Sequence, residues 1–111
     1  MSIRVYEIIA AGVTDGNFAK ICIKMAQRRR IVRFCNVRGL ECASASIICN
    51  NYREDLDKAC MLYRMGYVDA IIIAGTEGWS ESEKALFVEL TAASKAKVIN
   101  LDDLDCRYFI D

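Results

Sequence analysis

Residues 68–74 of this 111-residue chain read VDAIIIA, an almost uninterrupted apolar run. A strand with one wet face alternates apolar and polar residues, whereas a strand covered on both faces reads as a continuous apolar segment. Coverage on both faces is typical of a parallel sheet that lies between two layers of helices. The run therefore predicts a three-layer α/β fold.

Strand and helix patterns alternate along the rest of the chain. Two capping boxes mark helix starts, Asn51 with Glu54 and Ser80 with Glu83, and Gly66 is expected to end the first of these helices. The expected elements are a strand at 3–10, a helix at 17–29, a strand at 31–35, a helix at 52–65, a strand at 68–74, a helix at 81–95 and a strand at 97–101. Residues 36–50 fit either a loop and strand or a loop and short helix. We expect one α/β domain over 1–111, with a mostly parallel sheet of about four or five strands and helices on both faces, of the flavodoxin- or Rossmann-like type.

The chain contains no histidine. This absence excludes Ser-His-Asp and Cys-His nucleophile systems and removes the most common metal ligand. Any catalysis would depend on carboxylates, hydroxyls or thiols. We expect no metal and no cofactor.

The formal net charge is zero, but the two signs are unevenly distributed. Residues 1–53 carry nine basic and three acidic side chains, whereas residues 54–111 carry six basic and twelve acidic ones. Two copies would attract each other head to tail, which favours a homo-oligomer. Alternatively, the two signs interleave once the chain is folded.

Six cysteines are present, and no two of them form a C-x-x-C motif. The first residues do not have the pattern of a signal peptide. We therefore expect reduced, buried cysteines in a cytoplasmic protein rather than a disulfide framework. The apolar runs are too short for a membrane span, so we expect no membrane partner.

Residues 67–99 contain a series of residue types in a distinctive order, namely Asp69, the apolar strand 71–73, Gly78, Trp79, Ser82, Ala85, Glu89 and Ala93. This order resembles the second half of the nucleoside 2-deoxyribosyltransferase-like proteins, in particular their smaller phage and bacterial members. These proteins cleave or exchange the N-glycosidic bond of deoxynucleosides or their monophosphates. The resemblance implies that Glu89 is the nucleophile. Here the tryptophan-to-glutamate spacing is one residue longer than usual in the family, which places Val88 in register, and Lys84 replaces a glycine.

Helical phase bears on the role of Glu89. At about 100° per residue, Glu89 shares an arc with Ser82 and several alanines, whereas Val88 falls toward Lys84. Because small residues allow a helix to lie close to a sheet, we expect Glu89 to point inward. It would then act as the nucleophile or pair with a basic side chain.

Further candidates lie in the loops after the strands and in the basic first half. We expect base and sugar to contact Tyr6, Gly12, Asp15, Gly75, Thr76, Gly78, Trp79 and Ser82, and a phosphate to contact Arg33 and Arg38. Each has a structural alternative: Asp15 as a helix cap, the 75–78 loop as a tight turn, Trp79 as a staple at the helix start, and the arginines as a solvated helix end.

The leading hypothesis is a nucleoside or nucleotide N-glycosidase-like protein, either a hydrolase or a deoxyribosyltransferase. The alternative is a non-catalytic α/β module that binds a nucleotide or a protein. The expected partner is a small nucleoside or nucleotide, and we expect no nucleic-acid partner because the basic segment lacks interleaved aromatic residues.

Overall fold

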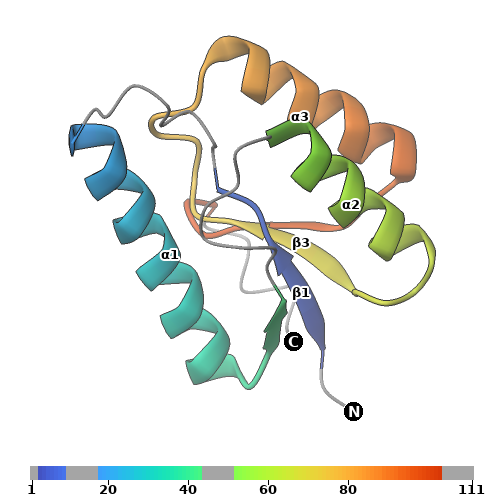
Figure 1. Ribbon diagram of the computed structural model, residues 1–111. Helices are drawn as coiled ribbons and strands as arrows, with labels where there is room; N and C mark the ends of the chain where they lie inside the picture. Colours follow the sequence, from blue (N-terminus) through green and yellow to red (C-terminus); the bar gives the residue numbers. More distant parts are fainter. Residues whose placement is uncertain (1–2, 10–17, 44–51, 104–111) are drawn as a thin grey trace.

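A computed structural model of the protein describes residues 3–9, 18–43 and 52–103. The elements follow in the order β1 (Arg4–Glu7), α1 (Phe18–Arg38), β2 (Glu41–Ala43), α2 (Tyr52–Arg64), β3 (Ala70–Ile73), α3 (Glu81–Ser94) and β4 (Val98–Asn100). Strands and helices therefore alternate, as the sequence predicts (Figure 1).

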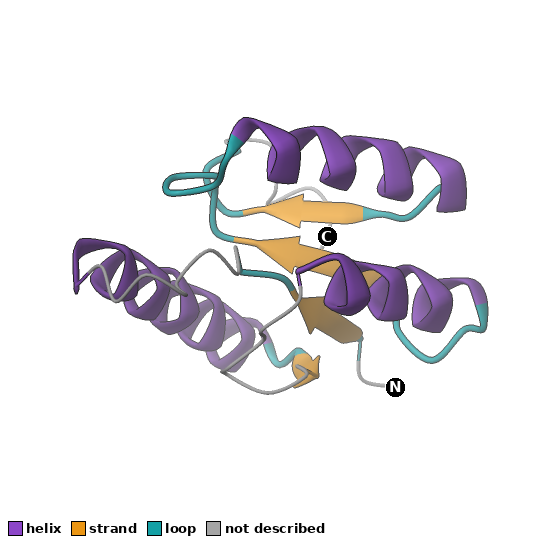
Figure 2. Ribbon diagram, turned by 45° about the horizontal axis from the view of Figure 1, so that its top comes forward, coloured by secondary structure: helices purple, strands orange, loops and turns teal. Residues whose placement is uncertain are grey.

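The four strands form one parallel sheet in the order β2-β1-β3-β4. Helix α1 lies on one face of the sheet, and α2 and α3 lie together on the other (Figures 1 and 2). The predicted three-layer α/β fold with a parallel sheet is confirmed. β1 and β3 occupy the centre of the sheet, so their neighbours on both sides satisfy their backbone hydrogen bonds.

Side-chain alternation along the strands divides the core in two. On the face beneath α2 and α3, the strands contribute Tyr6, Ile8, Ile71 and Ile73. On the face beneath α1, they contribute Val5, Ala70, Ile72 and Ile99. Every residue of β3 is buried, which explains why its sequence is continuously apolar.

Helix α1 is much longer than predicted. The expected strand at 31–35 is wrong, because these residues continue the helix to Arg38. Ile31 and Cys35 are four residues apart, so they lie on the same side of the helix and are buried against the sheet. The helix ends at Gly39, whose φ of 70° few other residues adopt readily. β2 lies within the undecided stretch 36–50, which favours the loop-and-strand interpretation for residues 39–43.

Two helix boundaries agree with the sequence signals. Ser80 accepts a hydrogen bond from the N–H of Glu83, and the Glu83 side chain accepts one from the N–H of Ser80. Gly66, with a φ of 81°, follows the last turn of α2. Asn51 lies outside the described residues.

The described cysteines only partly follow the expectation of burial. Cys35 and Cys60 are buried, whereas Cys22 and Cys42 are exposed, and all four are free thiols. Within the ranges that the structure describes, no helix is long and apolar enough to cross a bilayer.

The helical state of residues 31–35 can be tested with two neighbouring β-branched residues. Ile31 is fully buried, whereas Val32 is 38% exposed. We expect Ile31→Ala to lower the free energy of unfolding by about 2–4 kcal/mol and Val32→Ala to lower it by under about 1 kcal/mol. Urea denaturation measures both values. Equal losses would contradict the helical assignment, because a strand covered on both faces would bury both side chains.

Candidate functional site

The crossover connections reverse direction at the centre of the sheet. From β1 the chain passes through α1 to β2, and from β3 it passes through α3 to β4 on the opposite side. In open parallel sheets, ligands bind outside the carboxyl ends of the strands where the direction of the crossovers reverses. The candidate site therefore lies at the carboxyl ends of β1 and β3.

The loop after β3 is held against the turn after β4. The N–H of Gly75 donates to Oδ1 of Asn100 over 3.1 Å, and the N–H of Asp102 donates to the same oxygen over 3.0 Å. Gly75 has a φ of 77°, and a Cβ at this position would lie 1.9 Å from Oδ2 of Asp102. Glycine suits this position because its φ is rarely adopted by other residues, and a Cβ would also displace the Asp102 carboxylate.

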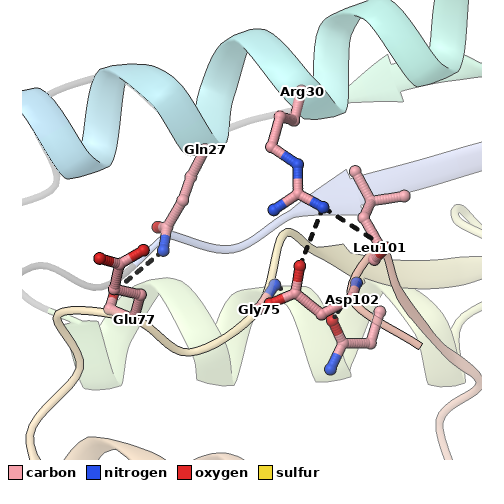
Figure 3. Close-up of polar contacts among 7 residues, drawn as sticks. Gln27, Arg30, Gly75, Glu77, Leu101 and Asp102 are labelled. Atoms are coloured by element: carbon pink, nitrogen blue, oxygen red, sulfur yellow. Dashed lines mark hydrogen bonds and ion pairs between the residues drawn. The ribbon is translucent and has the colours of Figure 1, made fainter.

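Side chains of helix α1 also contact this loop and the turn after β4. Nε2 of Gln27 donates to the backbone oxygen of Glu77 over 2.9 Å, and the Arg30 guanidinium lies 2.9 Å from Oδ1 of Asp102 (Figure 3). The loop then closes through a tight turn, in which the N–H of Trp79 donates to the oxygen of Thr76 over 3.0 Å. The backbone of the 75–79 loop is therefore positioned before any ligand arrives.

Aromatic and carboxylate side chains meet on the α2 and α3 face. The Tyr6 hydroxyl donates to Oδ1 of Asp55 over 2.6 Å, and both residues are buried. The Tyr52 hydroxyl donates to the backbone oxygen of Glu83 over 3.1 Å. Burial raises the pKa of Tyr52, and the nearby carboxylates Glu83 and Asp55 raise it further, so Tyr52 remains a neutral donor.

Trp79 completes this group and has an unusual feature. Its ring makes edge contacts with Tyr52 and Phe87, at centroid distances of 5.6 and 5.4 Å. The indole is only 6% exposed, and its Nε1–H has no acceptor among the described residues. A buried donor without an acceptor costs about 1–3 kcal/mol, so a ligand that supplies an acceptor would gain from it.

A second polar group lies on the α1 face at the end of β1. The Glu7 carboxylate is 4% exposed and forms an ion pair with Arg28 of α1. It also accepts a hydrogen bond from the Cys42 thiol, whose Sγ lies 3.4 Å from Oε2. Burial raises the pKa of Glu7, and the Arg28 cation opposes this shift without cancelling it.

The structure does not bring every predicted residue to this site. Glu89 and Ser82 are exposed on α3, so the expectation that Glu89 points inward is wrong. Phe87 and Thr91 are the buried residues of that helix. Burying the large Phe87 side chain stabilises the fold more than packing the alanines close to the sheet would. The helix therefore turns Phe87, and not the alanine face with Glu89, toward the core.

The two arginines expected to bind phosphate also lie elsewhere. Arg38 is the last residue of α1, beside the amino end of β2, and its guanidinium lies 5.7 Å from the centre of the Phe34 ring. Arg33 is exposed and lines a groove on the outer side of α1. Neither residue reaches the carboxyl edge of the sheet. Gly12 and Asp15 lie outside the described residues.

Of the remaining candidates, Tyr6, Gly75, Thr76, Gly78 and Trp79 do lie at the carboxyl edge. Trp79 occupies the core at the start of α3, which matches the alternative role of a staple. Sequence reasoning missed Glu7 and Asp55. It considered the basic run from Arg28 to Arg30 for a phosphate, whereas Arg28 forms an ion pair with Glu7. Glu7 follows two apolar residues of a predicted strand, and this position was a signal that it could be buried. No local pattern distinguished Asp55 from the other acidic residues of α2.

Comparisons with known proteins identify no family. No family model matches this chain, and no curated protein matches it. A solved structure described as "Solution structure of a phosphate-loop protein" has a TM-score of 0.47 and 17% sequence identity, over 97% of this chain and 84% of that chain. The support for the candidate site therefore comes from its own geometry.

The ion pair between Arg28 and Glu7 predicts a pH-dependent effect. We expect Arg28→Met to lower the free energy of unfolding by about 2–3 kcal/mol at pH 7, because it leaves a buried carboxylate without a cation. The pKa of Glu7 lies above its ordinary value of 4.5, so the native state holds the proton more tightly than the unfolded state. The contribution of Glu7 to stability is therefore complete below about pH 4.5 and is lost as the pH rises through the raised pKa.

The deficit of Arg28→Met should consequently be smaller at pH 5 than at pH 7, and urea denaturation at the two pH values measures it. Adding Glu7→Gln to Arg28→Met should restore most of the loss at pH 7, because the carboxylate is removed. A deficit independent of pH, or a double variant as unstable as Arg28→Met, would contradict this account.

Proposed function

We propose that this protein binds a nucleoside or nucleotide at the carboxyl ends of β1 and β3. The observation that carries the proposal is the buried Nε1–H of Trp79, which has no acceptor among the described residues and belongs to the residue that closes the loop after β3. Base carbonyl oxygens and sugar hydroxyls are suitable acceptors for such a donor. The resemblance of residues 67–99 to the deoxyribosyltransferase-like proteins suggests the ligand class.

The neighbouring polar groups suit the same ligand. Tyr6 donates a hydrogen bond to Oδ1 of Asp55, and a carboxylate is a suitable acceptor for sugar hydroxyls. The loop from Gly75 to Trp79 is held in place by Asn100 and Gln27. A preformed loop supports binding because little conformational entropy is lost when the ligand arrives.

Calorimetric titration with deoxynucleosides and their 5′-monophosphates tests this proposal. Trp79→Phe keeps an aromatic ring but removes the N–H, and we expect it to weaken binding about tenfold, which corresponds to one hydrogen bond of about 1.4 kcal/mol. Val88→Ala, an exposed change on α3, serves as the control and should bind as the parent does. Absence of binding at millimolar ligand, or equal affinity in Trp79→Phe, would exclude the proposal.

Cleavage of the N-glycosidic bond is the second candidate function. The observation that favours it is the Tyr6–Asp55 pair, because it places a buried carboxylate at the edge where the ligand is proposed to bind. A carboxylate beside an anomeric carbon can act as a nucleophile. Glu89 is exposed on α3, so we assign this role to Asp55 instead.

Release of free base from deoxynucleosides and their monophosphates measures this activity. We expect Asp55→Asn to lower the rate at least a hundredfold and Glu89→Gln to leave it unchanged, with circular dichroism confirming that both variants fold. Binding without release of base would leave the binding function and remove the catalytic one. A loss of release in Glu89→Gln alone would restore the glutamate implied by the resemblance.

Two broader expectations stay predictions. A cytoplasmic location is consistent with the four free thiols among the described residues, since disulfides are rare in that compartment. Self-association is supported by the apolar side chains of Met25, Val32 and Val37, which are exposed on the outer side of α1.

A further inference from the structure

Two cysteines face each other beneath the carboxyl-terminal half of α1. Cys35 belongs to the α1 core cluster, together with Val5 of β1. Cys42 pairs with Val5 in the parallel register of β1 and β2, so its side chain points to the same face of the sheet as Val5. The register and the helix therefore bring the two thiols together from adjacent elements.

The contacts of these thiols show how they differ. Cys35 is only 2% exposed, whereas Cys42 is exposed on the edge strand. The neighbouring Cys42 thiol lowers the pKa of Cys35, while burial and the Glu7 charge act in the opposite direction. The pKa of Cys42 is raised by its proximity to Cys35, by burial and by Glu7. Cys42 is thus the accessible thiol, and Cys35 is the buried thiol behind it.

We propose that Cys35 and Cys42 form a redox-active dithiol that closes into a disulfide between α1 and β2. The two residues are seven positions apart, and Gly39 turns the chain between them. The other described thiols are placed differently. Cys22 is exposed near the start of α1, and Cys60 lies in the core on the opposite face of the sheet, with its Sγ 3.7 Å from the oxygen of Leu90.

The oxidant in the proposed reaction is a small disulfide such as oxidised glutathione. The sulfur of Cys42 loses its proton and attacks one glutathione sulfur, the glutathione S–S bond breaks, and one glutathione leaves as its thiol. The Cys35 thiol then gives up its proton and attacks Sγ of Cys42, the mixed disulfide breaks, and the second glutathione leaves as its thiol with that proton. Two protein thiols are oxidised to one disulfide, and one glutathione disulfide is reduced to two thiols.

Closure would also alter the polar group at the end of β1. The Cys42 thiol donates to Oε2 of Glu7, and a disulfide sulfur has no proton to donate. Glu7 would then retain Arg28 as its charged partner. The proposed redox site is therefore coupled to the end of a central strand, although it does not depend on the proposed nucleotide binding.

Mass spectrometry of the intact, non-reduced protein after incubation with oxidised glutathione tests the proposal. We expect the protein to lose two hydrogens, and trypsin should yield the peptides 34–38 and 39–53 joined by a disulfide. Tandem fragmentation assigns the bond to Cys42 or to Cys49 within the second peptide. A bond from Cys35 to another cysteine, a stable glutathione adduct without closure, or no reaction would each overturn the proposal.

Two serine variants supply an independent measurement. Cys35→Ser should stop at a mixed disulfide between Cys42 and glutathione, because the attacking thiol is missing. Cys22→Ser removes an exposed thiol from the same helix and should close at the parental rate. An unchanged mass loss of two hydrogens in Cys35→Ser would overturn the assignment. If Cys35→Ser does not fold by circular dichroism, the peptide map of the parent protein decides the question.

Discussion

Strand β3 has no exposed side chain, and this burial sets the requirements for the surrounding structure. A strand covered on both faces needs a helix on each side and a hydrogen-bonded neighbour along each edge. β1 and β4 are the hydrogen-bonded neighbours of β3, α1 covers one face, and α2 and α3 cover the other. The two halves of the core follow from this arrangement, because successive residues of one strand belong to opposite clusters.

The fold was predictable from the sequence where a local signal had a single structural meaning. The Ser80 and Glu83 box marked the start of α3, and Gly66 marked the end of α2. Residues 31–35 were assigned incorrectly because a five-residue apolar segment fits a strand and a buried helical turn equally well. Only the position of the sheet against Ile31 and Cys35 decides between them.

The candidate site was less predictable, because its residues come from separate elements. The loop from Gly75 to Trp79 could be located, since it follows the clearest strand. The orientation of Glu89 could not be predicted, because two faces of α3 carry apolar residues. The face with the large Phe87 side chain is buried in preference to the face with the alanines. Glu7 and Asp55 lie on opposite faces at the end of β1, and the Asp55 charge adds to the raised pKa of Glu7. That coupling exists only in the folded chain.

Helix α1 runs as one uninterrupted element from the carboxyl ends of the strands to the amino end of β2. Gln27 and Arg30 contact the loops that follow β3 and β4 (Figure 3), whereas Cys35 lies farther along the helix, nearer to β2, and packs in the core. Each added residue turns an α-helix by about 100°. An insertion or deletion between Arg30 and Ile31 would therefore rotate one part of the helix against the other. Either Gln27 and Arg30 would lose their loop contacts, or the residues after Arg30 would lose their packing in the core. Homologous chains should vary in length in their loops and conserve the residue count of this helix.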